Sequence, residues 1–194
     1  MTAPDPFAGA LFLIAAFVLA GLAQTVWLGS PASRAFALPL DGGRTFRGRR
    51  IFGDNKTLRG FLVMVPAAGA AFVLLARLTE GTAGTAHGLW PLAPSGYWWL
   101  GVVAGIGFMV GELPNSFVKR QLGIAPGQAP PAGVALFVCF LADRVDSIIG
   151  MLTAVSLAVP LSVRTWGVVL LIGPTIHYLF SHLLFVVGVK ARSA

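Results

Sequence analysis

Two aspartates, Asp143 and Asp146, lie three residues apart inside an apolar stretch that runs from Pro131 to Pro160. This spacing predicts that both carboxylates share one face of a helix, with Ser147 beside them. An ionised carboxylate is costly in hydrocarbon, so an acidic pair inside a membrane span indicates a functional site. The two charges repel each other and need a proton or a counter-charge. Oxygen ligands with room for phosphate suit Mg²⁺, which predicts a metal site.

Two other roles remain open for these acids at the level of the sequence. One aspartate of the pair can instead form a salt bridge with Arg144 or with a cation on another helix. Glu112 lies at the cytoplasmic end of the preceding apolar stretch. It could be a third oxygen ligand or an interfacial acid.

A second chemically active segment lies between Ser30 and Gly60. It interleaves glycine with arginine, lysine and small polar side chains, and it contains Lys56, one of three lysines in the chain. Glycine lets backbone N–H groups approach a phosphate, while Arg and Lys supply positive charge. The segment suits a polyphosphate, although an ordinary basic loop is an equal interpretation. Its spacing is not that of a Walker A loop.

These residues need a scaffold, and the composition indicates a membrane protein. Hydrophobic residues make up 56% of the 194 positions and charged residues 11%, more apolar material than a soluble core of this size buries. We therefore expect an all-α, polytopic membrane protein with a single domain over residues 1–194 and a retained first helix. Five stretches are long enough to cross a hydrocarbon core of about 30 Å, namely Phe7 to Gly29, Phe61 to Leu78, Tyr97 to Leu113, Ala132 to Val159 and Thr165 to Val189.

The positive charges predict the orientation in the membrane. Most of the 14 Lys and Arg residues fall in two connections and the C-terminal tail: Arg34, Arg44, Arg47, Arg49, Arg50, Lys56, Arg59, Lys119, Arg120, Lys190 and Arg192. Such residues mark the cytoplasmic side, which places the N-terminus outside and the C-terminus in the cytoplasm. Membrane orientation and anionic headgroups therefore explain most of the net charge of +7, which need not indicate nucleic-acid binding.

Small residues predict how the third stretch packs. Gly101, Gly105, Gly107 and Gly111 form two Gly-xxx-Gly spacings, which let another helix approach closely. The single cysteine, Cys139, excludes an internal disulfide and a Cys-rich metal site, and its apolar setting favours a packing role.

Three ordered segments carry a family resemblance: Gly53 to Gly60, Gly111 to Arg120, and Asp143 to Gly150. Together they resemble the CDP-archaeol synthases, the small archaeal-type branch of the CTP:phosphatidate cytidylyltransferase (CDP-diglyceride synthase) family. The Ser-x-x-Lys-Arg…Asp-Arg-x-Asp pattern is similar to the signature of the whole family.

Further elements extend the resemblance over nearly the full chain. These are Asp41-Gly42-Gly43 and Thr175-x-His177…Lys190. The chain departs from the expected pattern at two asparagine positions, with Gln24 and Trp27 near the end of the first stretch and Ser181-His182 in the last. These departures bear on lipid-tail or headgroup preference more than on the chemistry.

The resemblance implies transfer of CMP from CTP to a lipid phosphate at the cell membrane, with cytoplasmic loops forming the nucleotide site and Mg²⁺ as cofactor. Its partners would be CTP, a membrane lipid phosphate and the bilayer, without nucleic acid; homo-oligomerisation stays open. The implied catalytic residues are Lys119, Arg120, Asp143 and Asp146. The implied CTP and phosphate ligands are Asp54, Asn55, Lys56, Thr57, Arg59 and Ser116. The implied metal ligands are Asp143 and Asp146, with Glu112 as a third candidate.

Three alternatives accompany this interpretation. The lipid acceptor is either an archaeal-type ether lipid or a diacylglycerol phosphate. An ion- or proton-coupled transporter would also place acids inside a membrane span, but it predicts polar residues in both membrane halves. A CDP-alcohol phosphotransferase needs a different pattern around its first acid, which Asp143 to Ser147 do not fit.

Overall fold

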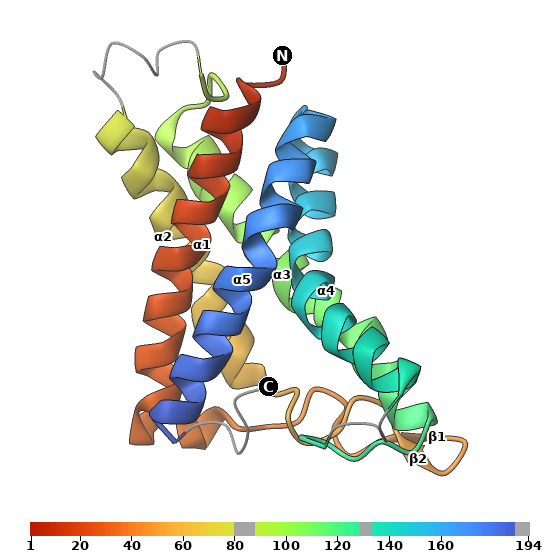
Figure 1. The fold of residues 1–194 in the computed structure, drawn as a ribbon. Helices are drawn as coiled ribbons and strands as arrows, with labels where there is room; N and C mark the ends of the chain where they lie inside the picture. The colour runs from red at the N-terminus through yellow and green to blue at the C-terminus, as the bar shows by residue number, and fades with distance from the viewer. Residues whose placement is uncertain (80–87, 129–132, 189–194) are drawn as a thin grey trace.

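The computed structural model describes residues 1–79, 88–128 and 133–188 (Figure 1). Long helices dominate this part of the chain, joined by a short 3-10 helix and a two-stranded hairpin. The elements in order are α1 (Pro6–Gly29), η1 (Pro31–Phe36), β1 (Thr45–Phe46), β2 (Arg49–Arg50), α2 (Leu58–Thr79), α3 (Pro94–Gln121), α4 (Val134–Ala158) and α5 (Val163–Val186). The predicted ends at Ala132 and Val189 lie outside the described residues.

Four of these helices, α1, α2, α3 and α5, are long and apolar enough to cross a membrane. The fifth, α4, has similar length but carries Asp143, Arg144 and Asp146 in its interior. The prediction of a mostly helical, polytopic membrane protein is confirmed. The small β1–β2 hairpin is an addition to the expected all-α architecture.

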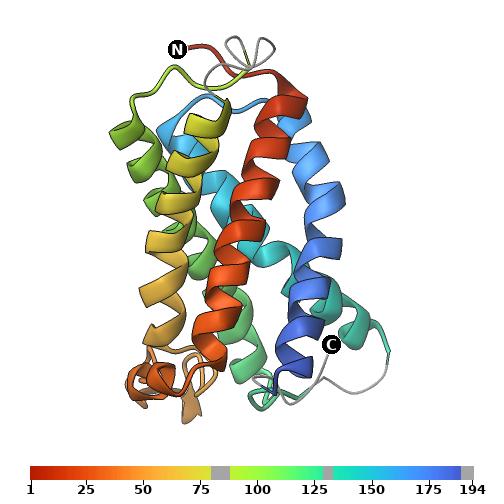
Figure 2. The same cartoon turned by 90° about the vertical axis from the view of Figure 1, so that its left-hand side faces the viewer.

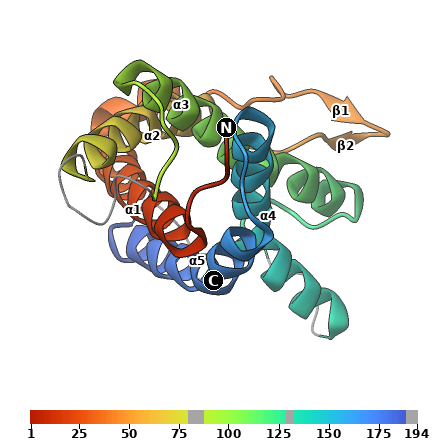
Figure 3. The same cartoon turned by 90° about the horizontal axis from the view of Figure 1, so that it is seen from above.

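The five helices form a closed ring in which neighbours pack in the order α1, α2, α3, α4, α5 and back to α1. Figure 2 shows α1 between α2 and α5, and Figure 3 shows α3 and α4 completing the ring. The loop from η1 to the hairpin lies at the end of the ring opposite the N-terminus (Figure 1). The ends of α3 and α5 and the start of α4 lie at this same end, which we call the basic end.

The glycines of α3 set its distance to both neighbours. A Cβ on Gly101 would lie 2.5 Å from the carbonyl oxygen of Ala68 in α2. On the α4 side, a Cβ on Gly150 would lie 2.2 Å from the carbonyl oxygen of Gly107 and 2.7 Å from Cα of Gly111. The predicted close approach of helices at these spacings is therefore confirmed.

The third apolar stretch continues further than the sequence indicated. We expected it to end at Leu113, before Pro114, but α3 runs through Pro114 to Gln121. Proline removes one backbone hydrogen bond without ending a helix whose neighbours hold it in place. At about 1.5 Å per residue, α3 is about 42 Å long and exceeds a hydrocarbon core of about 30 Å. Lys119 and Arg120 therefore lie on a helix and not in a loop.

Candidate active site

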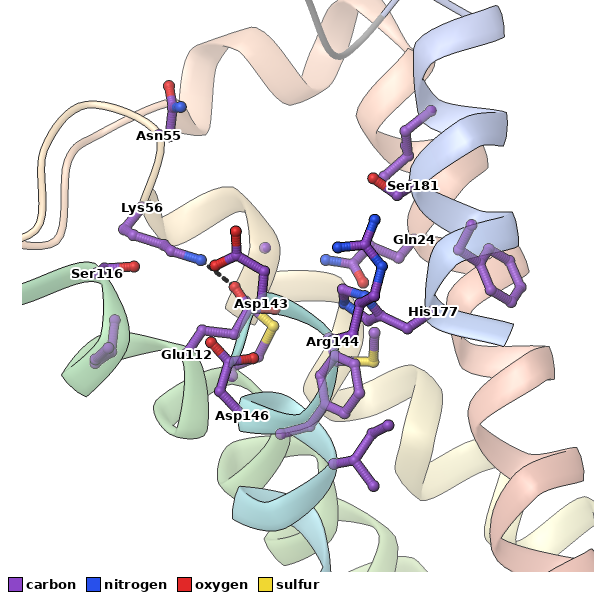
Figure 4. A pocket seen from close by; sticks show the side chains of 18 of the residues that line it. Gln24, Asn55, Lys56, Glu112, Ser116, Asp143, Arg144, Asp146, His177 and Ser181 are labelled. Atoms are coloured by element: carbon purple, nitrogen blue, oxygen red, sulfur yellow. Dashed lines mark hydrogen bonds and ion pairs between the residues drawn. The ribbon is translucent and has the colours of Figure 1, made fainter. Parts of the chain in front are cut away.

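One cavity of about 1010 Å³ opens among all five helices and the loop before α2. Figure 4 shows that its polar side chains come from separate elements, and that Lys56, Glu112, Asp143 and Asp146 lie close together. Every residue given a site role from the sequence lines it: Asp54, Asn55, Lys56, Thr57, Arg59, Glu112, Ser116, Lys119, Arg120, Asp143 and Asp146. The structure thus brings together residues that lie up to 92 positions apart in the chain.

Asn115 of α3 joins the two aspartates of α4. Its side-chain nitrogen donates to Oδ1 of Asp143 at 2.6 Å and to Oδ2 of Asp146 at 2.9 Å. Ser147 donates to the other carboxylate oxygen of Asp146, from its backbone N–H at 2.7 Å and from its hydroxyl at 3.2 Å. The two carboxylates are consequently held side by side, as their spacing predicted.

Two lysines bring positive charge to the acids. Lys119 of α3 forms an ion pair with Asp143 of α4, and Lys56 of the loop forms one with Glu112 of α3. The hydroxyl of Ser147 shares its one hydrogen between Asp146 and the second oxygen of Glu112, which lies 3.0 Å away, and so links Glu112 to the aspartate pair. This network joins the loop, α3 and α4 at one point.

The two arginines of the signature behave differently from the lysines. Arg144 donates to the carbonyl oxygen of Phe140 at 2.7 Å, and its guanidinium lies 3.3 Å from the centre of the Phe140 ring. The salt-bridge alternative is therefore realised by Lys119 and not by Arg144. Arg120 is 9% exposed and packs beside Gly53. A Cβ added to Gly53 would lie 3.4 Å from Cδ of Arg120 and 2.8 Å from Cγ of Pro126. Gly53 has φ +86°, so its backbone also favours glycine.

The acidic pair offers carboxylate oxygens of the kind that a divalent cation binds. One oxygen of each aspartate lies within 2.9 Å of the same Asn115 nitrogen, and the side chain of Asp143 is 46% exposed toward the cavity. Carboxylate oxygens with an open side suit Mg²⁺, which retains water or phosphate ligands. Glu112 is engaged by Lys56 and Ser147, and in the described part of the chain no three acids, histidines or cysteines form a metal-binding group.

A second polar centre holds the loop that supplies Lys56. The buried carboxylate of Asp41 accepts hydrogen bonds from the backbone N–H groups of Gly43, Phe52 and Gly53 at 2.9 to 3.0 Å. Arg50 donates to it at 2.6 Å and also pairs with Asp54 at 2.7 Å. Asp41 had no predicted role beyond the family resemblance, and its position before two glycines was the available signal.

These contacts shift the pKa values of the charged groups in this loop. Burial alone would raise the pKa of Asp41, but the bonds from Arg50 and three backbone N–H groups hold this pKa well below its usual range. The bond to Asp41 in turn raises the pKa of Arg50. Burial opposes a charge on Lys56, yet the nearby Glu112 carboxylate raises the pKa of this lysine above its ordinary value. All three groups are charged at neutral pH.

The positions that depart from the expected family pattern also reach the cavity. Gln24 of α1 and Ser181 of α5 both line it, together with His177 (Figure 4). Trp27 lies at the edge of the site, where its indole N–H donates to the carbonyl oxygen of Arg59 at 3.0 Å. His182 is exposed beside Phe185. The sequence marks Gln24 and Ser181 only as departures from the family pattern. Their common position at the cavity becomes visible only in the folded structure.

The cavity is polar at the basic end and apolar toward the middle of the helices. All five helices contribute to its apolar lining, which includes Leu13, Ile14, Phe17, Met64, Phe108, Ile148, Met151, Val169 and Ile176. A molecule with a charged head and an apolar tail fits such a gradient. The polar residues gather at one end, which does not match the distribution expected of a transporter.

Comparisons with known proteins agree with this geometry. The chain is 34% identical to a CDP-archaeol synthase of Halobacterium salinarum, covering 78% of this chain and 81% of that protein. It is 33% identical to a CDP-archaeol synthase of Methanoculleus marisnigri, covering 78% and 87%.

The fold is similar to a solved structure described as an intramembrane enzyme for archaeal membrane lipids biosynthesis. The TM-score is 0.52, at 24% identity over 84% of this chain and 88% of the other. A family model described as CarS-like, CDP-archaeol synthase, matches residues 11–192. The chain therefore belongs to the CarS-like CDP-archaeol synthase family.

Proposed function

We propose that this protein transfers CMP from CTP to a membrane lipid phosphate and releases pyrophosphate. The observation that carries the proposal is the single cavity whose charged end holds Lys56, Lys119 and the aspartate pair and whose other end is apolar. A nucleoside triphosphate needs the first environment and a lipid needs the second. Membership of the CDP-archaeol synthase family supports the same reaction.

In the proposed reaction, an oxygen of the lipid phosphate attacks the α-phosphorus of CTP. The new P–O bond forms as the bond between the α-phosphorus and the bridging oxygen to the β-phosphate breaks, and pyrophosphate leaves with that electron pair. A phosphate monoester has a second pKa of about 6, so the nucleophile is largely ionised at neutral pH. The protein thus needs to align two anions and offset their charge rather than supply a strong base.

The residues of the cavity divide these tasks. Lys119 and Arg120, which extend from the last turn of α3, bind phosphate oxygens. Residues of the loop before α2 form the CTP site: Asp54, Asn55, Lys56, Thr57 and Arg59, with Ser116 facing them from α3. Asp143 and Asp146 hold Mg²⁺, which when bound offsets negative charge on the triphosphate. Glu112 keeps Lys56 in the cavity through their ion pair.

The membrane placement follows from the charges. The basic end faces the cytoplasm, where CTP is available, with five helices crossing the bilayer. The acceptor is an archaeal-type ether lipid phosphate, in keeping with the relatives of the chain, and a diacylglycerol phosphate is the competing substrate.

One assay tests the proposal. Purified protein in detergent receives radiolabelled CTP, Mg²⁺ and either an ether-linked or an ester-linked lipid phosphate. We expect a labelled CDP-lipid and pyrophosphate in equal amounts, faster with the ether lipid, and no product after chelation until Mg²⁺ is restored. Absence of product with both acceptors would refute the proposed reaction, and faster turnover of the ester lipid would refute the acceptor assignment.

A further inference from the structure

The β1–β2 hairpin projects from the basic end and takes no part in the cavity. Thr45 pairs with Arg50 and Phe46 with Arg49, so Arg47 and Gly48 form a two-residue turn. Both turn residues have positive φ, 52° and 74°, as a type I′ turn requires. Asparagine, aspartate or glycine normally occupies the first of these positions, because other side chains crowd the backbone there. The chain places an arginine at this costly position.

The hairpin exposes cations that have no acidic partner. Residues Gly42 to Arg49 are exposed throughout. Within the described part of the chain, no carboxylate forms an ion pair with Arg44, Arg47 or Arg49, whereas the adjacent Arg50 pairs with two acids. The hairpin therefore directs Arg50 inward and leaves Arg44 and Arg47 exposed, without an acidic partner among the described residues.

An exposed aromatic ring accompanies these cations at the tip. Phe46 is 46% exposed, and the guanidinium of Arg47 lies 5.3 Å from the centre of its ring. The Phe46 ring lies 5.7 Å from that of Phe117. A shallow hollow lies between these rings and is lined by Phe46, Arg47, Arg49, Phe117 and Gln121. A cation beside an exposed apolar ring is the pattern of a segment at the membrane–water interface.

The position of the hairpin agrees with that interface. Arg49 donates to the carbonyl oxygen of Gln121, the last residue of α3, which holds the hairpin at the level where this helix ends. Val118 and Leu122 are 52% and 67% exposed, as expected of residues that face lipid. Viewed along the helices, the hairpin extends sideways beyond the ring (Figure 3). We expect an arm that extends sideways at this level to overlie lipid.

We propose that the β1–β2 hairpin is a membrane-surface anchor that binds anionic phospholipid headgroups. Arg44 and Arg47 pair with headgroup phosphates while Phe46 enters the interfacial layer. The positive charges of these arginines complement the negative headgroups, and each Lys or Arg near an anionic surface strengthens association about fivefold. This role is separate from the proposed transfer reaction, because Arg44, Phe46 and Arg47 do not line the cavity.

The test measures the surroundings of residue 46 in vesicles. Phe46→Cys in a Cys139→Ala background is labelled with an environment-sensitive dye. The protein is then reconstituted into phosphatidylcholine alone or mixed with phosphatidylglycerol. We expect a blue shift of emission, and quenching by nitroxides attached near the lipid headgroup, that both increase with phosphatidylglycerol. Arg47→Asn, which the turn tolerates, should weaken this response about fivefold, and Arg47→Lys should retain it.

Controls make the result specific. Arg164→Gln removes an exposed cation at the opposite end of the molecule and should leave the response unchanged. Full cytidylyl transfer in detergent by the labelled protein and by each variant shows that the cavity is intact. Quenching by aqueous iodide alone in both vesicle types would overturn the proposal. Protection of the label that depends on protein density instead of lipid charge would also overturn it, since it would indicate contact between copies of the chain.

Discussion

The ammonium of Lys56 and the carboxylate of Glu112 form an ion pair inside the cavity, which ties the loop before α2 to the third helix. Both side chains are largely buried, at 24% and 20% exposure. Removing one partner leaves the other charge unpaired, whereas removing both leaves a neutral site. Single and double variants can therefore distinguish the contribution of the ion pair to stability from the contribution of Lys56 to activity.

We predict that Lys56→Met and Glu112→Gln each destabilise the protein by about 3 kcal/mol. The double variant should recover most of this loss while remaining inactive, because the proposed CTP site still lacks the lysine. Thermal unfolding in detergent and cytidylyl transfer, measured on the same samples, check the two effects. A double variant as unstable as either single one would show that the pair is not coupled in this way.

The aspartate pair gives a prediction about catalysis. Asp143→Asn and Asp146→Asn should each lower kcat at least about 100-fold, since in the proposed reaction both carboxylates hold the metal that offsets charge on the triphosphate. The fold should persist, because Asn115 and Ser147 can still hydrogen-bond to an amide oxygen. Activity is measured across a Mg²⁺ titration, and circular dichroism reports the helices.

A matched control is available at the other end of the molecule. Asp5 caps α1 by accepting from the backbone N–H groups of Phe7 and Ala8, and asparagine caps a helix equally well. Asp5→Asn should therefore have wild-type activity. Near-normal turnover in both Asp143→Asn and Asp146→Asn would return the pair to a purely structural role.

Asp41→Asn should raise the KM for CTP more than it lowers kcat. Asparagine offers one acceptor oxygen and places an N–H₂ group against donors that the carboxylate accepts. The expected loss of stability is about 3 kcal/mol. Arg50→Lys keeps the positive charge opposite Asp41 and should have a smaller effect on both quantities.

The pH dependence of the wild type follows from the same carboxylate. Its pKa is lower in the folded protein than in the unfolded chain, so its contribution is complete above the unfolded value of about 3.9. That contribution is lost as the pH falls from there toward the folded pKa. Thermal unfolding of wild type and Asp41→Asn should therefore converge only in strongly acidic buffer, and convergence near pH 6 would contradict this account.

The contact between α3 and α4 predicts a steric effect. A Cβ on Gly150 would meet the backbone of Gly107 and Gly111, so Gly150→Ala must separate the helices and move Asp146 away from Asn115. We expect a loss of several kcal/mol in stability and loss of activity. Gly167→Ala on α5 meets nothing within 4 Å and should be neutral or slightly stabilising. Thermal unfolding of the two variants provides the comparison.

Hydropathy predicted the membrane helices because it is a local property of the chain, whereas most of the residues that line the site were implied by the family resemblance. The sequence missed the course of α3 beyond Pro114, because local chain preference suggested a stop where neighbouring helices keep the segment helical. It also missed the role of Asn115, whose partners lie 28 and 31 residues away on another helix. Gln24 and Ser181 meet at the cavity only because α1 and α5 are neighbours in the ring.

The three charges of α4 have a consequence for the biogenesis of the protein. A charged residue at the centre of a helix costs about 2.5 to 3.5 kcal/mol on scales of translocon-mediated insertion. Asp143, Arg144 and Asp146 therefore make α4 a poor substrate for insertion by itself. Asn115 and Lys119, which interact with these aspartates, are on α3, which is synthesised first. We therefore expect α4 to insert more favourably together with α3 than alone, which would give the polar network a role in biogenesis.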